Sequence, residues 1–301
     1  MTTSNLLRLG LGIGWRPEIA LLIDRRRDLG FVEIMAEDFD DDTPLPAPIE
    51  RLRRQGVAIV PHGLSMSLGS AEPLDHGKVE ALANLAVRVH APLVSEHIAF
   101  VRGGGLETGH LLPVPRTWEA LELVVANIRE AKAALPVPLA LENIATLFDW
   151  PDSELDEAEF LTEVLVQADV QLLLDIENVY ANARNHGYDP VEFLGRIPLE
   201  RIAYVHVAGG VERDGLYHDT HTHDVPAAVL DLLAELCARA DVPGVMLERD
   251  DQFPANTRLN AELDAIAAAA VRGESTRREA ARIRAGDDRP NPERSEHAPV
   301  G

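Results

Sequence analysis

The chain has 301 residues, 46% of them hydrophobic, so it is long enough for one (β/α) barrel or for two smaller domains. Its formal charge of −22 argues against nucleic-acid binding through a general basic surface, because such binding depends on lysine and arginine side chains that displace counterions. Cys237 is the only cysteine, which excludes a disulfide framework and a cysteine-based zinc or iron–sulfur site. A bound metal must therefore use nitrogen and oxygen ligands.

The sequence contains no sign of a membrane segment or a secretion signal. No apolar run approaches the roughly 20 residues needed to span a bilayer. The N-terminal residues have neither a basic start nor a small-residue cleavage site. These observations predict a cytoplasmic protein with no membrane partner.

Short apolar runs alternate with helical segments along the chain. The intervening segments, such as 117–135 and 226–240, carry apolar residues at the three- and four-residue spacing of a helix packed on a sheet. Repeated strand–helix alternation predicts an α/β fold, a single (β/α)8 TIM-type barrel. The predicted strands are 7–14, 31–37, 58–63, 92–100, 138–144, 170–178, 202–209 and 244–250.

We place the barrel domain at residues 1–271. The remaining segment, 272–301, mixes arginines with acidic residues, has no Phe, Trp or Tyr, and ends in polar sequence that contains proline. Such a composition favours a flexible tail beyond a short helix. We therefore expect no site residue in this segment.

Potential metal ligands lie near the carboxyl ends of six consecutive predicted strands, the face where barrels build their active sites. Strand residues two apart share a face, and the neighbours in phase, such as Val60 and Tyr204, suit a packed barrel interior. These candidates can therefore point inward together. They are His62, His97, Glu142, Asp175, His206 and Glu248.

Each candidate alone has a simpler explanation, because a strand histidine is often a hydrogen-bonded core residue and a strand-end carboxylate often caps the next helix. Together, however, they would place Glu142, Asp175 and Glu248 at one mouth, where like charges are costly unless they are paired. Arg249 and Arg116 could offset part of this charge. Metal ions account for all six positions at once.

The stretch "YHDTHTHDVP", residues 217–226, follows the seventh predicted strand and lies at the same mouth. We expect Asp219 and His221 to complete the ligand set. If the loop is extended, His223 shares their side, and we expect it to contact a ligand from outside, to be solvated, or to serve as an alternative ligand. His218 points the other way.

Four histidines and four carboxylates are too many for one ion, so the set predicts a cluster. Such ligands suit iron, manganese or zinc. Ligand types alone leave two chemistries open, because iron would activate dioxygen and zinc would activate water for hydrolysis. Rival motifs are weak: "GLGIGWRP" lacks the third glycine of a dinucleotide-binding loop, and no P-loop or G-x-S-x-G is present.

A series of motifs resembles the multinuclear non-haem iron-dependent oxidases, which include the subunit that makes oxazolone groups in methanobactin biosynthesis. The resemblance runs in order from about Gly10 to Pro254. The motifs are "GIGWRPE", "FVEIMAEDF", "VPHGLSMSLG", "SEHIAF", "LALENI", "LLLDIENVYANARNHG", "YVHVAGG", "DTHTHD" and "MLERDDQFP".

This resemblance implies a TIM barrel that carries two or three iron ions, with dioxygen as co-substrate. It also implies oxidation of a cysteine, aspartate or asparagine in a ribosomally made precursor peptide, together with a separate partner protein that binds the peptide leader. Asn178 is implied as an additional ligand and Glu37 as a residue near the substrate. The implied metal ligands are His62, His97, Glu142, Asp175, His206, Asp219, His221 and Glu248.

The chain departs from the family pattern at Glu177, where relatives usually have asparagine. A carboxylate there could change metal occupancy or contact the substrate. Beyond the metal cluster, no catalytic residue is identified. Two alternatives remain open: a zinc-dependent barrel hydrolase or isomerase of the endonuclease or xylose-isomerase type, and a non-catalytic metal-binding subunit.

Overall fold

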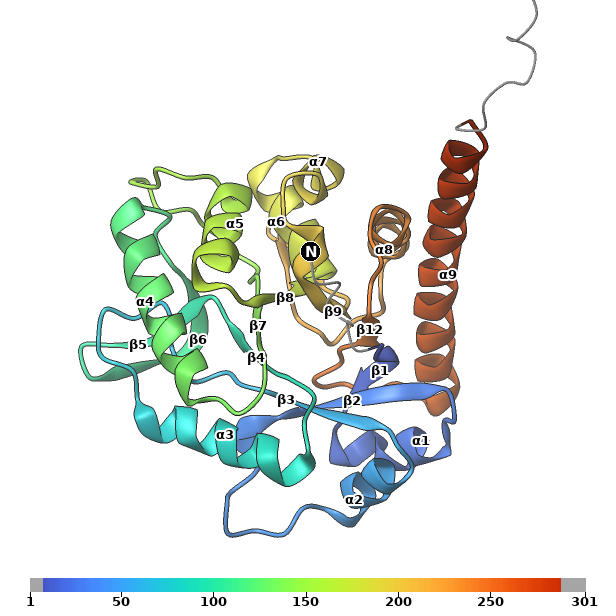
Figure 1. Cartoon of the computed structure of the whole chain (residues 1–301), viewed down its shortest axis with the longest axis horizontal. Helices are drawn as coiled ribbons and strands as arrows, with labels where there is room; N and C mark the ends of the chain where they lie inside the picture. The colour runs from blue at the N-terminus through green and yellow to red at the C-terminus, as the bar shows by residue number, and fades with distance from the viewer. Residues whose placement is uncertain (1–7, 288–301) are drawn as a thin grey trace, which may run out of the picture.

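The computed structural model describes residues 8–287, and eight of its strands form a closed barrel (Figure 1). All neighbouring strands in the barrel are parallel, in the order β1-β12-β9-β8-β7-β4-β3-β2. The predicted TIM-type barrel and its eight strands are therefore confirmed. The strands are β1 (Gly10–Gly14), β2 (Leu29–Met35), β3 (Ala58–His62), β4 (Val94–His97), β7 (Leu139–Glu142), β8 (Gln171–Asp175), β9 (Ile202–Val207) and β12 (Gly244–Leu247).

Most of the predicted strands were too long, and two of them show why. The run 170–178 continues past β8, which ends at Asp175. The Asp175 carboxylate accepts a hydrogen bond from the Asn178 N–H and so begins helix α6 (Ile176–His186). The run 92–100 likewise combines β4 with the start of β5 (Ala99–Gly103). Polar residues at these strand ends belong to loops and caps as much as to strands.

The barrel interior is filled by one small apolar layer that includes Phe31, Val60, Ala140, Tyr204 and Met246. The strand alternation predicted inward positions for Val60 and Tyr204, and the structure places both side chains in this layer. A Cβ at Gly12 would lie 2.4 Å from the Phe31 ring, so a glycine is needed where this ring crosses the barrel. The layer closes the barrel below the polar mouth.

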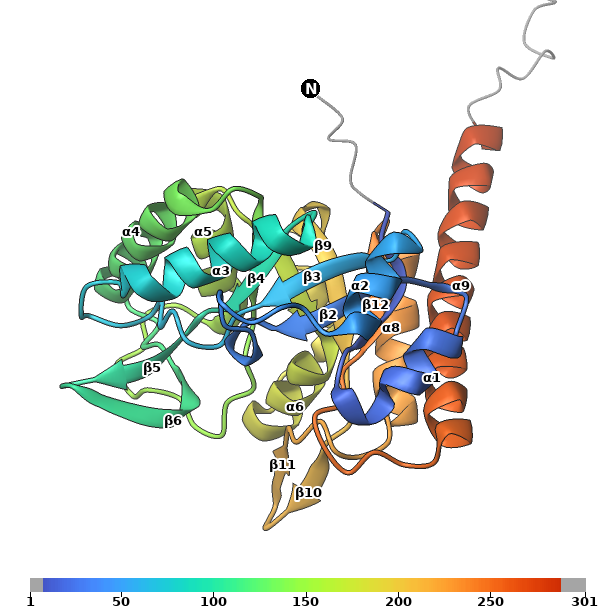
Figure 2. The ribbon, with the colours of Figure 1, turned by 90° about the horizontal axis from the view of Figure 1, so that it is seen from below.

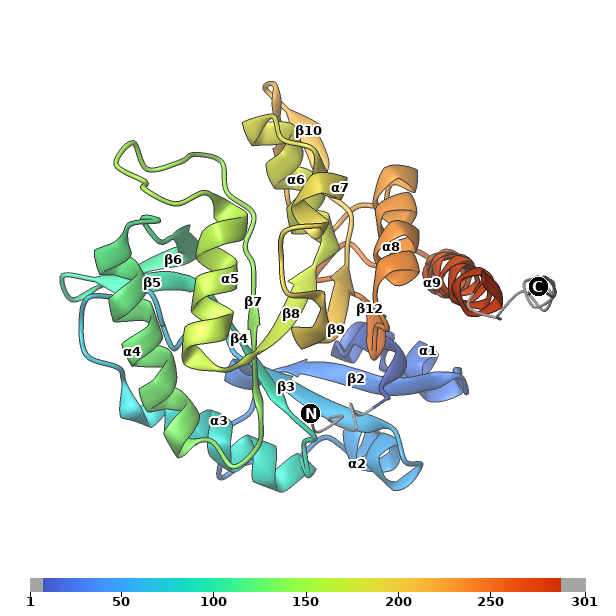
Figure 3. The same ribbon diagram turned by 45° about the horizontal axis from the view of Figure 1, so that its top comes forward.

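Helices surround the barrel and pack their apolar faces on it (Figure 3). The predicted helix 117–135 is α4, and Thr117 caps its first turn by accepting the Ala120 N–H. The predicted helix 226–240 is α8. The helices are α1 (Ala20–Arg25), α2 (Ala47–Arg54), α3 (His76–Val89), α4 (Trp118–Ala134), α5 (Glu157–Ala168), α6, α7 (Pro190–Leu194), α8 (Ala227–Arg239) and α9 (Asn256–Asp287), with 3-10 turns at Pro17–Ile19, Ala36–Asp38 and Leu199–Arg201.

Helix α9 runs through the expected domain boundary after residue 271 without a break. It lies beside α8, where a Cβ at Gly273 would be 2.1 Å from the Ala234 carbonyl oxygen. Arg277 also donates to Asp241 at 2.6 Å. The first part of the expected tail is thus helical and packed, and residues 288–301 lie outside the described part of the chain.

Two hairpins, which the sequence reading did not predict, extend from the mouth side of the barrel (Figure 2). One is formed by β5 and β6 (Leu106–Pro113), and the other by β10 (Val211–Arg213) and β11 (Leu216–His218). Both follow the carboxyl end of a barrel strand, so they stand beside the predicted ligands. None of the described helices is long and apolar enough to cross a bilayer.

Candidate metal centre

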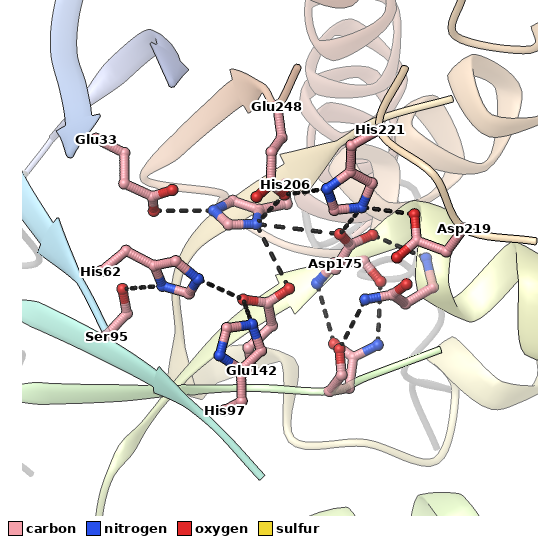
Figure 4. A network of polar contacts seen from close by, with 12 residues as sticks. Glu33, His62, Ser95, His97, Glu142, Asp175, His206, Asp219, His221 and Glu248 are labelled. Atoms are coloured by element: carbon pink, nitrogen blue, oxygen red, sulfur yellow. Dashed lines mark hydrogen bonds and ion pairs between the residues drawn. The ribbon is translucent and has the colours of Figure 1, made fainter. Parts of the chain in front are cut away.

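The structure brings all eight predicted ligands together at the carboxyl ends of the strands (Figure 4). Glu142 of β7 lies at the middle of the set. Its Oε2 atom is 3.4 Å from His62 Nε2 and 3.2 Å from His97 Nε2, while its Oε1 atom is 3.5 Å from His206 Nδ1. One carboxylate therefore faces histidines from three other strands.

The loop residues reach the same centre from above the barrel. His221 Nε2 lies 2.6 Å from Asp219 Oδ1 and 3.8 Å from Asp175 Oδ2. Glu248, which follows β12, lies 2.7 Å from His206 Nδ1. Asp219 and His221 therefore lie beside the strand-end residues, as expected, and their role as metal ligands stays a prediction.

The four histidines share one arrangement, in which one ring nitrogen faces the carboxylates and the other contacts an outer partner. The outer contacts are His62 Nδ1 to Ser95 Oγ (2.8 Å), His97 Nδ1 to the Gly63 carbonyl (3.1 Å), His206 Nε2 to Glu33 (2.9 Å) and His221 Nδ1 to Asp250 (3.2 Å). Histidines that bind metals use this pattern, because the outer hydrogen bond fixes the ring and its tautomer.

Two of these outer partners belong to one buried chain of hydrogen bonds. The Tyr204 hydroxyl lies 2.7 Å from Ser95 Oγ and donates to Glu33 Oε2 at 2.5 Å. His62 and His206, at opposite ends of this chain, thereby have their orientations coupled through a tyrosine of the barrel interior. Figure 4 shows both ends of the chain.

Six atoms of the eight predicted ligands are buried and have no hydrogen-bond partner, although most lie close to another polar atom. The 2.6 Å contact of His221 with Asp219 and the 2.7 Å contact of His206 with Glu248 fail the angular requirement of a hydrogen bond. Lone pairs that converge in this way suit a shared cation. The atoms are Glu142 Oε2, Asp175 Oδ2, His206 Nδ1, Asp219 Oδ1, His221 Nε2 and Glu248 Oε2.

The donor atoms fall into overlapping groups of a size that fits metal ions. Atoms of each group lie within 4.8 Å of one another, and ligands of one ion with bonds of about 2.1 Å stand about 3 to 4.2 Å apart. The groups are His62–His97–Glu142, Glu142–Asp175–His206–Glu248, Glu33–His62–Glu248, Glu177–Asp219–His221 and His221–Glu248–Asp250.

Charges at the centre are balanced unevenly. Burial opposes ionisation of Glu142, but His97 and His206 outweigh it and hold the pKa of this carboxyl below its usual range. Burial together with the charge of Glu142 raises the pKa of Asp175 well above its usual range. Burial and the charge of Asp219 raise the pKa of Glu177 to about 11. The negative charges of Asp175 and Glu177 are thus compensated less by histidines than the charge of Glu142.

Arginine does not supply the missing compensation. Arg249 donates to Glu262 at 2.8 Å, and Arg116 donates to Asp149 at 2.9 Å. Among residues 8–287, no lysine or arginine forms an ion pair with a carboxylate of the groups above other than Asp250, which pairs with Arg16. The sequence reading allowed Arg249 and Arg116 a share of the neutralisation, and the structure assigns them to other partners.

The loop of residues 219–226, called the ligand loop below, holds His221 in an unusual backbone conformation. Its φ is +50°, in the left-handed region that costs a non-glycine residue about 1 kcal/mol or more. The conformation is held by the His221 carbonyl, which accepts the Asp250 N–H at 3.0 Å. Strain of this kind accompanies side chains that are positioned for function.

A cavity of about 680 Å³ opens above the donor atoms. Its floor includes His62, His97 and Glu142, while Leu112 of β6 and Leu147 and Phe148 after β7 form an apolar wall. Mostly apolar walls around a few convergent polar groups are typical of binding sites. The volume and shape leave room for a side chain and its neighbouring peptide groups.

The remaining predicted site residues lie in different surroundings. Asn178 lines the cavity; its Nδ2 donates to the Asn143 carbonyl, and its Oδ1 is buried without a partner. His223 is exposed and contacts Thr220 and Thr222. Their assignments remain predictions.

Glu37 lies outside the large cavity. Its carboxylate accepts hydrogen bonds from the Leu64 N–H and the Ser65 hydroxyl, and it borders a separate cavity of about 230 Å³. Glu177, by contrast, is fully buried beside Asp219 and His221. The predicted contacts of both with a substrate remain predictions.

Sequence reasoning missed the outer partners Ser95, Glu33 and Asp250. Glu33 carried a detectable signal, because it is an acidic residue inside a predicted apolar strand. Ser95 is in phase with His97 in its strand, but it binds His62 of the neighbouring strand, and only the sheet pairing of His62 with Ser95 reveals this contact.

Comparison with solved structures supports the fold alone. The chain superposes on an L-ribulose 3-epimerase with a TM-score of 0.54 and 16% identity, covering 93% of this chain and 99% of that chain. It superposes on the IolI protein with a bound zinc atom with a TM-score of 0.54 and 14% identity, covering 88% and 97%. At these identities the activities of the neighbours do not transfer.

Sequence relatives are much closer. A UPF0276 protein of Streptomyces avermitilis is 52% identical over 265 residues, which cover 86% of this chain but 54% of that protein, so the chain spans about half the length of this relative. A UPF0276 protein of Caulobacter vibrioides is 37% identical over 257 residues, covering 85% and 92%. Residues 10–271 match the model of the RiPP precursor modification enzymes MbnB/TglH/ChrH, and the chain belongs to this family.

Proposed function

We propose that this chain is a multinuclear non-haem iron enzyme that uses dioxygen to oxidise a residue of a ribosomally synthesised precursor peptide. The modified residue would be a cysteine, an aspartate or an asparagine. We further propose that the enzyme works in the cytoplasm, where such a peptide is made, and with a separate protein that binds the peptide leader. Membership of the precursor-modifying family supports the peptide substrate.

One observation carries the metal part of the proposal: four histidines each turn one nitrogen to an outer partner and the other to a carboxylate of the centre. A histidine in a merely structural cluster would gain nothing from leaving the facing atoms without hydrogen bonds. The residues present therefore fit a metal cluster. We assign as ligands His62, His97, Glu142, Asp175, His206, Asp219, His221 and Glu248.

Bound iron would supply a redox-active centre that reduces dioxygen and holds a substrate heteroatom. The chain itself contributes ligand geometry, because barrel strands fix His62, His97 and Glu142 at their carboxyl ends. Glu142 belongs to two donor groups, so its two oxygens can serve neighbouring ions. Two or three ions per chain would use all the assigned ligands.

The cavity provides the place for the peptide. Its apolar wall of Leu112, Leu147 and Phe148 would cover a bound residue and reduce access of water to the centre. The Asn178 amide oxygen, which is buried beside the cavity and lacks a partner, would accept a peptide N–H or bind an ion. Positioning and exclusion of water are therefore the contributions expected from side chains that do not bind metal.

The proposal is tested with protein purified without dioxygen and a precursor peptide encoded beside its gene. Elemental analysis and Mössbauer spectroscopy of an iron-enriched sample would give about two or three iron ions per chain. Mass spectrometry would then detect a modified peptide with dioxygen and unchanged peptide without it. The same product under both conditions, or full activity with zinc alone, would contradict the oxidase and favour a hydrolase or isomerase.

A further inference from the structure

Glu177 is the most unusual charged residue of the site. It lies in the first turn of α6, its side chain is 0% exposed, and neither carboxylate oxygen has a hydrogen-bond partner. Buried carboxylates in folded proteins are normally hydrogen-bonded or paired. The environment of Glu177 therefore lacks the partner that its chemistry requires.

The donor atoms nearest to Glu177 belong to the ligand loop. One oxygen of Glu177, one of Asp219 and a ring nitrogen of His221 lie within 4.8 Å of one another. His221 Nε2 and Asp219 Oδ1, 2.6 Å apart, also have no hydrogen-bond partner. Three side chains from two segments thus present unpartnered atoms to one place.

The backbone makes room for this arrangement. A Cβ at Gly210 would lie 2.6 Å from Glu177 Oε1 and 2.3 Å from the His218 carbonyl oxygen. The chain after β9 therefore passes the carboxylate at a distance that any larger residue would block. The start of α6 adds the favourable potential of a helix N-terminus, which stabilises negative charge but leaves both oxygens free.

We propose that Glu177 is a metal ligand and that, with Asp219 and His221, it forms an ion position separate from those that share Glu142. Two carboxylates and one imidazole suit a hard or borderline divalent cation such as Fe²⁺ or Mn²⁺. A carboxylate at residue 177 adds negative charge to this position, so the position binds its ion more tightly than it would with a neutral side chain there. The inference rests on the proposed assignment of Asp219 and His221 as metal ligands.

The test compares wild type with Glu177→Gln, which keeps the shape of the side chain and removes its charge. Glu192→Gln is the matched control, since Glu192 is an exposed carboxylate in the first turn of α7. Protein is loaded anaerobically with Mn²⁺ and passed through a desalting column, and bound metal is counted and titrated. We expect Glu177→Gln to lose one ion, or to bind it at least about 10-fold more weakly, while Glu192→Gln matches wild type.

Anomalous diffraction from Mn²⁺-loaded wild-type crystals gives a second measurement that needs no variant. An ion peak about 2.2 Å from a Glu177 oxygen supports the inference. Equal metal content and affinity in wild type and Glu177→Gln, or ions placed away from Glu177, would overturn it. Neither measurement depends on iron or dioxygen. The role of Glu177 can therefore be judged even if the oxidase proposal is wrong.

Discussion

The two sides of the candidate metal centre are built differently. On one side, His62, His97 and Glu142 stand on barrel strands, and their side chains are 2 to 6% exposed. On the other side, Asp219 and His221 stand on a loop with side chains 21% and 12% exposed, one of them in a left-handed backbone conformation. The strand side is fixed by the sheet, whereas the loop side is held by a few hydrogen bonds.

The strongest test of this contrast is Glu142→Gln. Glu142 faces His62, His97 and His206, so its loss removes a donor from two groups at once. We expect loss of at least one bound ion and a fall in activity greater than the roughly 10- to 100-fold that follows loss of an outer partner. Metal analysis and peptide mass spectrometry measure both effects, and retention of full metal content would show that Glu142 is no ligand.

A second test measures whether the loop side releases metal first. Because Asp219 and His221 are more exposed than the strand ligands, a chelator should remove one ion quickly and the remainder slowly. His221→Ala should abolish the fast phase and leave the slow one, whereas His62→Ala should change the slow phase. Stopped-flow chelation with an indicator dye would reveal the phases. A single phase in wild type, unaffected by either substitution, would remove the distinction between the two sides.

A third test addresses the chain that couples His62 to His206. Tyr204→Phe leaves the buried Ser95 and Glu33 without their shared partner, which should lower the free energy of unfolding by about 1 to 3 kcal/mol. Metal affinity should fall about 10-fold through the two histidines. Tyr180→Phe is the control, because the Tyr180 hydroxyl accepts only a 3.3 Å contact from Arg184. Urea unfolding and metal titration check both effects, and unchanged affinity would make the chain structural only.

The smallest effect is expected away from the candidate metal centre, at Glu157, a half-buried carboxylate that accepts two hydrogen bonds. Asn182 donates to it at 2.9 Å and Tyr188 at 3.2 Å, and burial raises the pKa of Glu157 from 4.5 to about 7. The folded protein therefore holds a proton that the unfolded chain loses, so stability falls as pH rises from about 4.5 through 7.

Glu157→Gln should remove this pH dependence without changing metal content. The full shift corresponds to about 3 kcal/mol, and partial exposure reduces the expected gain of the variant at pH 8 relative to pH 5 to about 1 to 2 kcal/mol. Urea unfolding at both pH values measures it, with Glu163→Gln on the same helix as the control. A change in the amount of bound metal would mean that Glu157 also contributes to metal binding.

The sequence by itself determined the barrel and the strand side of the centre. Alternation of apolar strands and amphipathic helices reflects how each element buries its apolar surface, and this is a local property. A ligand at the end of a strand needs only the barrel topology to reach the mouth, so His62, His97, Glu142, Asp175, His206 and Glu248 could be selected from the chain alone.

Only the tertiary structure decided the outer partners and the loop. Ser95 serves His62 because β3 and β4 pair in one register, and Glu33 meets His206 across the barrel. The arginines that could have neutralised the mouth turn to other acids, and Glu177 is buried without a partner. These contacts depend on distances between segments that are far apart in the chain. The spacing of residues along one strand or helix does not predict such distances.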